Sequence, residues 1–146
     1  DMRRQVLAKL RELLGGTRGK TIAIWGLAFK PNTDDVREAA ALEIIHLLQS
    51  DGASVRAYDP VAMPNARNHL KHVVFCDDAY GAAEGADALV LVTEWNEFKQ
   101  MNMARVAASM KQPVLIDGRN IYDPAQMAQS GFAYRGVGRG NYVNAA

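Results

Sequence analysis

Hydrophobic and polar positions follow two alternating periods along the chain, and each change of period marks an expected element. Short β-rich or wholly apolar runs, typical of strands, lie between segments whose apolar residues are spaced by three and four, typical of helices. The runs that predict strands are 21–25, 54–58, 73–76, 88–92, 114–117 and an edge strand at 132–134. The segments that predict helices are 3–14, 38–50, a short helix within 61–71, 77–84, 102–110 and 124–129.

This alternation with short connections predicts an α/β fold, an open and mostly parallel Rossmann-like sheet with helices on both faces. The run 88–92 is wholly apolar, as expected of a strand covered on both sides. The glycine-rich end, residues 136–146, predicts a frayed tail.

The first helix raises a separate question. Its apolar residues form one stripe that stops at Gly15-Gly16: Val6, Leu7, Leu10, Leu13 and Leu14. The sheet pattern begins only after Gly19, so we expect the stripe to need a missing neighbour or a partner subunit. Since Asp1 is not a translational start, we expect residues 1–18 to be the end of a longer helix and 19–146 to be the domain.

Composition narrows the function classes. Of the 146 residues, 49% are hydrophobic and 23% are charged, which is enough apolar material for a core. A formal net charge of +1 offers no footprint for nucleic acid or an acidic membrane. No apolar run approaches the length of roughly 20 residues that a membrane span needs. The single cysteine, Cys76, excludes an internal disulfide, and a cytoplasmic protein is expected.

Candidate chemistry lies in the loops that follow strands. Ligands of such sheets bind outside the carboxyl ends of strands, where the strand order switches. Three polar segments emerge there and are expected to converge: 26–38, 93–95 and 117–119. No catalytic triad or metal cluster is evident. His46 is expected to be a structural or surface residue rather than a base, and Cys76 a small buried hydrophobe.

The first of these loops favours an anion. Gly26 follows directly on a strand, where a side chain would obstruct a close turn. Lys30 and Arg37 are cations near helix starts, which suits a diphosphate. The loop lacks both the G-x-G-x-x-G fingerprint and the P-loop sequence. Simpler roles stay open: Phe29 as core packing, and Arg37 as half of a surface ion pair.

Other residues also have two interpretations. For Asp34 and Asp35 we favour capping of the following helix over acid–base chemistry. Arg119 either binds a phosphate in bidentate fashion or is solvated, with Asp117 capping a turn and Gly118 supplying a positive φ. Trp95 and Phe98 are expected to fill a gap between loop and helix.

Residues 26–38, G-L-A-F-K-P-N-T-D-D-V-R-E, closely resemble the signature that opens the C-terminal domain of UDP-glucose and GDP-mannose dehydrogenases. Further matches follow in order: Tyr58-Asp59-Pro60, Ala86-Asp87-Ala88, Thr93-Glu94-Trp95 with Phe98, and Asp117-Gly118-Arg119. The resemblance runs from about Lys20 to Arg135, and the first segment is more similar to the bacterial UDP-glucose branch.

The resemblance implies a role as the nucleotide-sugar-binding domain of an NAD-dependent enzyme. Phe29, Lys30 and Arg119 would hold UDP-glucose, and Arg37 would reach NAD held mainly by an N-terminal domain. Residues 1–18 would end a central helix that forms a homodimer. In this family a cysteine in a G-G-S-C-F-P-K-D-like segment carries thiohemiacetal and thioester intermediates. That segment is absent from residues 1–146, so no catalytic residue is assigned and the chain alone is expected to turn nothing over.

Other functions stay open beside this one. The same domain of an enzyme for GDP-mannose or UDP-N-acetylmannosamine would look similar, because few residues report on the sugar. An autonomous flavodoxin-like binding module and a purely structural dimerisation domain are the alternatives from other classes.

Overall fold

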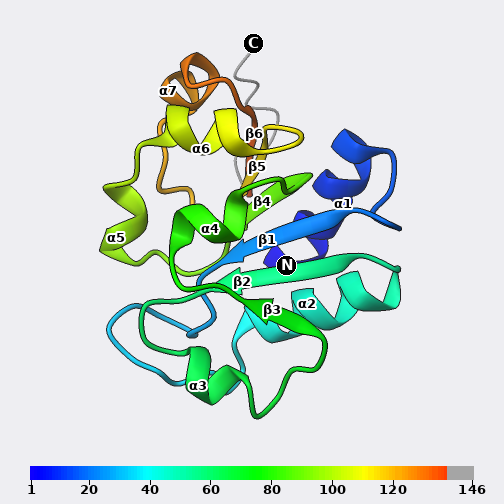
Figure 1. Ribbon diagram of the computed structural model, residues 1–146, viewed down its shortest axis with the longest axis vertical. Coiled ribbons are helices and arrows are strands. Elements are labelled where there is room, and N and C mark those ends of the chain that lie inside the picture. Colours follow the sequence, from blue (N-terminus) through cyan, green and yellow to red (C-terminus); the bar gives the residue numbers. More distant parts are fainter. Residues whose placement is uncertain (138–146) are drawn as a thin grey trace.

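The computed structural model describes residues 1–137, in which helices and strands alternate (Figure 1). The helices are α1 (Met2–Leu14), α2 (Ala40–Ser50), α3 (Met63–Ala66), α4 (Ala79–Ala83), α5 (Asn96–Lys99), α6 (Met103–Ser109) and α7 (Pro124–Gln129). The strands are β1 (Thr21–Trp25), β2 (Ser54–Tyr58), β3 (Val73–Phe75), β4 (Ala88–Leu91), β5 (Val114–Asp117) and β6 (Ala133–Gly136).

The strands form one parallel sheet in the order β3-β2-β1-β4-β5-β6. Helices α1 and α2 pack together on one face, and α4 packs on β1 and β2 beside α6 on the other (Figure 1). This confirms the predicted α/β architecture. The order reverses between β1 and β4, so the switch point lies at the carboxyl ends of these two strands.

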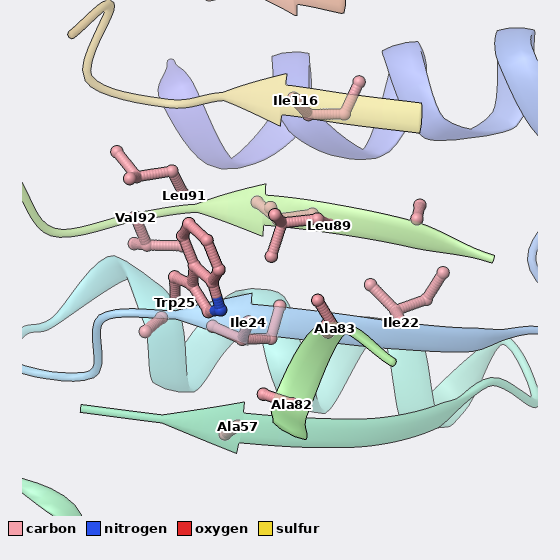
Figure 2. Packing of buried hydrophobic residues seen from close by; sticks show 14 of the residues in the cluster. Ile22, Ile24, Trp25, Ala57, Ala82, Ala83, Leu89, Leu91, Val92 and Ile116 are labelled. Atoms are coloured by element: carbon pink, nitrogen blue, oxygen red, sulfur yellow. The ribbon is translucent and has the colours of Figure 1, made fainter. Parts of the chain in front are cut away.

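The core lies around β1 and β4, whose side chains are almost all inaccessible to solvent. Figure 2 shows Ala82 and Ala83 of α4 over the strands, where their small side chains let the helix approach closely. Trp25 stacks on Phe98 with ring centroids 5.0 Å apart, and its indole N–H donates to the carbonyl of Ala79. The carboxyl end of β1, next to the switch point, is therefore well packed.

The expectation that the apolar stripe of the first helix needs a missing neighbour or a partner subunit is wrong. Val6 and Leu10 are fully buried and Leu7 nearly so, because α1 packs against α2 and β5 of the same domain. Periodicity identified the buried face of α1, but the surface that covers it comes from elements that lie much further along the chain.

The boundaries of α2 also differ from the expectation. Glu38 has φ 56° and Ala39 is the extended N-cap, without a side-chain hydrogen bond, so α2 begins at Ala40 rather than at 38. Asp34 and Asp35 therefore do not cap it, and that prediction is wrong. Asp78 caps α4 by accepting from the N–H of Gly81, as one of the two predicted N-caps.

The C-terminal part is described only as far as residue 137. The predicted edge strand is confirmed as β6, which pairs with β5. Gly136 ends this strand and Val137 is buried, so the expected tail does not begin at 136, and residues 138–146 lie outside the described part. Within residues 1–137, no helix has the length and apolarity that crossing a membrane requires.

Candidate functional site

The loops after β1, β4 and β5 converge at the carboxyl edge of the sheet, as predicted from the topology. The hydroxyl of Thr93 donates to the carbonyl oxygen of Ala28 at 2.5 Å, which joins the β4 loop to the β1 loop. On the other side, Arg119 donates to the carboxylate of Glu94 at 2.8 Å, which joins the β5 loop to the β4 loop. The three segments therefore form one continuous rim at the switch point.

Gly26 makes the first of these turns possible. Its φ is 99°, and a Cβ at this position would lie 2.6 Å from both the backbone nitrogen and the Cβ of Thr93. Its own N–H donates to the carbonyl of Tyr58. The predicted close backbone approach is therefore confirmed, and Thr93 is the residue approached.

Phe29 and Lys30 stand at the tip of the β1 loop. Phe29 is 48% exposed, so it is not core packing, although its N–H donates to the carbonyl of Asp35 and closes the loop. The ammonium of Lys30 lies 5.3 Å from the centroid of the Phe29 ring. An exposed aromatic ring beside an exposed cation suits a ligand with both a flat base and a phosphate.

Arg37 lies on the outer side of the same loop. Its Nε and Nη2 donate to the Asp35 carboxylate in bidentate fashion, at 3.0 and 2.8 Å, which confirms the expected surface ion pair. Its side chain is still 85% exposed, and two pockets of about 520 and 550 Å³ border it. Asn32 and Glu38 flank this segment with φ of 66 and 56 degrees respectively, a backbone conformation that non-glycine residues seldom adopt.

The Arg37 pair gives a direct test by titration. Hydrogen bonds from Arg37 lower the pKa of Asp35 from 3.8 to about 2. Because the folded pKa is depressed, the pair's contribution to stability is complete above the ordinary carboxyl pKa and is lost as the pH falls through the folded one. Replacing Arg37 by alanine should return the carboxyl titration, followed by NMR, toward 3.8, while Arg105→Ala should leave it unchanged. A midpoint near 3.8 in the unmodified protein would contradict the pairing.

Arg119 belongs to the β5 loop, and two carboxylates accept hydrogen bonds from it, one from its backbone and one from its guanidinium. Its N–H donates to Asp117 Oδ1, while Nε and Nη2 both donate to Glu94 Oε2. Burial alone would raise the pKa of Glu94, but hydrogen bonds from Arg119 and from its own N–H outweigh burial and leave the pKa lowered. Arg119 is thus an ordered cation in an ion pair rather than a freely solvated side chain.

Asp117 and Gly118 shape the turn that carries Arg119. Asp117 is fully buried and accepts from the N–H of Tyr122 and the hydroxyl of Tyr134. The positive φ that one of the two interpretations gave to Gly118 is not found, and Asn120 adopts that conformation instead. Gly118 is needed for closeness: a Cβ there would lie 2.7 Å from the carbonyl oxygen of Leu91.

Asp59 is the residue at this edge whose importance the sequence did not reveal. It is fully buried, and its carboxylate accepts hydrogen bonds from the loops after β1, β2 and β4. The available signals were an acidic residue between a predicted strand end and a proline, which is typical of a turn, and the match of Tyr58-Asp59-Pro60 to the family. Neither signal indicated which groups the carboxylate would bind. Trp95, whose indole N–H reaches Asp59, is buried as predicted, and so is Phe98.

Few other groups in the described residues are suited to metal binding or catalysis. No group of three His, Cys, Asp or Glu side chains able to hold a metal is found in residues 1–137. Cys76 is half-buried rather than buried, and desolvation raises the pKa of its thiol, which disfavours a nucleophilic thiolate. A pocket of about 560 Å³ between α6 and α7, lined partly by Met103 and Met127, contains none of the rim cations.

Residues 23–124 match the UDP-glucose/GDP-mannose dehydrogenase family, UDP binding domain. The chain belongs to this family. A UDP-glucose 6-dehydrogenase from Pseudomonas aeruginosa is 50% identical over 137 residues, which cover 89% of this chain and 30% of that protein. One from Bacillus subtilis is 46% identical, over 92% of this chain and 29% of that protein.

Solved structures place the same fold in longer enzymes. A UDP-glucose dehydrogenase from Pyrobaculum islandicum aligns with a TM-score of 0.78 and 34% identity, covering 92% of this chain and 29% of that one. A UDP-D-ManNAc dehydrogenase from Pyrococcus horikoshii aligns with a TM-score of 0.75 and 32% identity, covering 97% of this chain and 31% of that one. The chain thus spans about 30% of the length of the curated relatives that it matches.

Proposed function

We propose that this UDP-binding domain holds UDP-glucose for an NAD-dependent UDP-glucose 6-dehydrogenase, which oxidises the sugar to UDP-glucuronate. The observation that carries the proposal is the rim at the switch point, where Lys30 and Arg119 stand on neighbouring loops that touch through the β4 segment. The relatives with 50% and 46% identity are named UDP-glucose 6-dehydrogenases, which favours this sugar.

Each rim residue has a distinct task in this proposal. Phe29 supplies an exposed ring, and Lys30 a charge-assisted donor to the diphosphate. Arg119 keeps Nη1 outside its pair with Glu94, so this N–H is left to point at a phosphate oxygen. Because Glu94 holds the guanidinium and Asp117 holds the backbone N–H of Arg119, little side-chain freedom is lost when the ligand binds.

This domain is suited to a secondary contact with NAD and not to forming the main NAD-binding site. Residues 1–146 lack the dinucleotide fingerprint, but Arg37 is exposed on the rim with Nη1 unused by Asp35. We propose that Arg37 contacts an anionic group of NAD held mainly by an N-terminal domain. NAD would accept the hydride, and the residues of this chain would bind and orient the nucleotide sugar and the cofactor.

We further propose that residues 1–18 end a central helix through which the enzyme forms a homodimer, and that 19–146 is the nucleotide-sugar domain. The start of α1 lies at the site edge of the sheet, since Met2 Sδ is 3.4 Å from where a Cβ on Gly118 would stand. A cytoplasmic location is proposed because the lone Cys76 leaves no internal disulfide to need an oxidising compartment.

The test is NADH formation by the full-length protein that carries this domain. UDP-glucose should be oxidised with a higher kcat/KM than UDP-N-acetylmannosamine or GDP-mannose, and two NADH should form per sugar. A preference for UDP-N-acetylmannosamine would keep the domain's role and change the substrate. Absence of NADH formation with every nucleotide sugar would refute the dehydrogenase assignment.

Lys30→Ala tests the tip of the β1 loop. Loss of a charge-assisted contact to the diphosphate should weaken UDP-glucose binding by about 1–3 kcal/mol, or about 5- to 150-fold. Lys71→Ala, at the amino edge of the sheet before β3, is the matched control and should bind normally. Calorimetric titration of both variants decides the point: equal affinities would remove Lys30 from the site.

A further inference from the structure

One buried carboxylate ties together the loops that form the rim. Asp59 Oδ2 accepts from the N–H groups of Leu27 and Ala28, at 2.7 and 3.1 Å, and from the indole N–H of Trp95 at 3.0 Å. Its Oδ1 accepts from the N–H groups of the two residues after Pro60, Val61 at 2.8 Å and Ala62 at 2.7 Å. Five donors from the loops after β1, β2 and β4 thus meet at one side chain.

The surroundings of Asp59 make this arrangement rigid. The residue is 0% exposed, and within residues 1–137 no ion pair involves its carboxylate. Its charge is balanced by N–H donors alone, and each lies where the backbone or an indole ring holds it. Losing any one donor would leave part of this buried charge uncompensated.

The donors adjoin the residues assigned to the ligand. Leu27 and Ala28 directly precede Phe29 and Lys30, so Asp59 fixes the direction in which the tip of the β1 loop leaves the sheet. Trp95 follows Glu94, the partner of Arg119. The buried carboxylate therefore connects the β1 loop, with Phe29 and Lys30, to the β4 loop, whose Glu94 pairs with Arg119, and it is itself not exposed at the rim.

We propose that Asp59 is a positioning residue for nucleotide-sugar binding: it holds the β1 and β4 loops in the relative placement that lets Lys30 and Arg119 act on one diphosphate. This inference rests on the proposed function. Asp59 touches no ligand, and it acts through Leu27, Ala28 and Trp95.

Asp59→Asn is the decisive variant because it replaces one carboxylate oxygen by an NH₂ group. An amide offers a single carbonyl oxygen, so its NH₂ must face either the three donors at Oδ2 or the two at Oδ1. In either orientation the loops must move apart to relieve the donor–donor contact. Asp78→Asn makes the same chemical change at the N-cap of α4, where asparagine caps as well as aspartate, and serves as the control.

The experiment measures steady-state kinetics of the full-length enzyme at a temperature where thermal unfolding shows each variant to be folded. Asp59→Asn should raise KM for UDP-glucose at least about tenfold, because the placement of both loops controls its binding. It should change KM for NAD far less, because NAD is held mainly by an N-terminal domain. Asp78→Asn should match the unmodified enzyme in both. A purely structural role would lower the melting temperature and leave the KM for UDP-glucose as it was.

Trp95→Phe provides a second variant in case Asp59→Asn does not fold. It removes one donor and keeps a buried ring, so KM for UDP-glucose should rise in the same direction, about threefold. Unchanged KM for UDP-glucose in the folded variants overturns the positioning role while leaving the proposed function intact. An unmodified enzyme that does not oxidise UDP-glucose overturns the proposed function, and the inference with it.

Discussion

Replacing Gly26 by alanine is expected to destabilise the domain by about 2–6 kcal/mol, a large part of the ~5–15 kcal/mol that a domain of this kind has. Two costs add. The observed φ is 99°, and a non-glycine residue held in such a conformation costs about 1–3 kcal/mol. The new Cβ would also lie 2.6 Å from the backbone nitrogen of Thr93, and such overpacking costs about 1–3 kcal/mol.

Gly19→Ala separates these two costs. Gly19 also has a positive φ, 75°, but a Cβ there meets nothing within 4 Å. Its loss of stability should therefore be the backbone cost alone. Urea unfolding of both variants measures the difference, and equal losses would mean that Thr93 does not limit the approach of the β1 loop to the β4 loop.

Leu10→Ala is expected to reduce the free energy of unfolding by about 2–5 kcal/mol. Leu10 is fully buried where α1 packs against α2 and β5, so truncation leaves a cavity inside the domain. Leu47, on α2, is 37% exposed and provides the matched control. Leu47→Ala should change the free energy of unfolding by no more than about 0.5 kcal/mol, as is usual for surface substitutions.

The two leucine variants distinguish between two positions for the α1 stripe. If residues 2–14 packed mainly on a partner subunit, Leu10→Ala would weaken the dimer and leave the unfolding of this domain almost unchanged. Packing of the stripe inside the domain requires the opposite in equilibrium unfolding monitored by circular dichroism: a lower midpoint for Leu10→Ala, with the same dependence on protein concentration as in the unmodified protein.

The sheet was predictable because its strands are short and their burial is nearly complete. A wholly apolar run such as 88–92 has one stable environment, and parallel connections restrict the order of the strands. The convergence of the rim followed from this topology alone. The close turn at Gly26 was also predictable, since a glycine directly after a strand commonly marks a place where a side chain would obstruct the backbone.

The unpredicted helix α5 and the unforeseen cover of the α1 stripe share one physical cause, which is that contacts distant in sequence determined the outcome. Helix α5, which the sequence did not predict, has only four residues, too few to form on local propensity. It is held by the hydroxyl of Tyr58 on the Glu97 carboxylate and the hydroxyl of Tyr122 on the carbonyl of Phe98. Such anchors leave no periodic signal in the sequence.

The three segments that form the rim were predicted from the sequence, but the partners of its cations were only partly foreseen. The Asp35–Arg37 pair is local, two positions apart, and was among the expected alternatives. The pairing of Arg119 with Glu94 spans 25 positions and depends on β4 and β5 being neighbours. The hydrogen bonds to Asp59 come from three loops. They become visible only when the side chains are placed.

The most direct test of the central claim, that this domain recognises the UDP part of a nucleotide sugar, is calorimetric titration of the full-length protein with UDP and with GDP. Binding of UDP that is lost or strongly weakened in Lys30→Ala, with no measurable response to GDP, is the predicted result. Equal binding of the two nucleotides, or tighter binding of GDP, would contradict the claim.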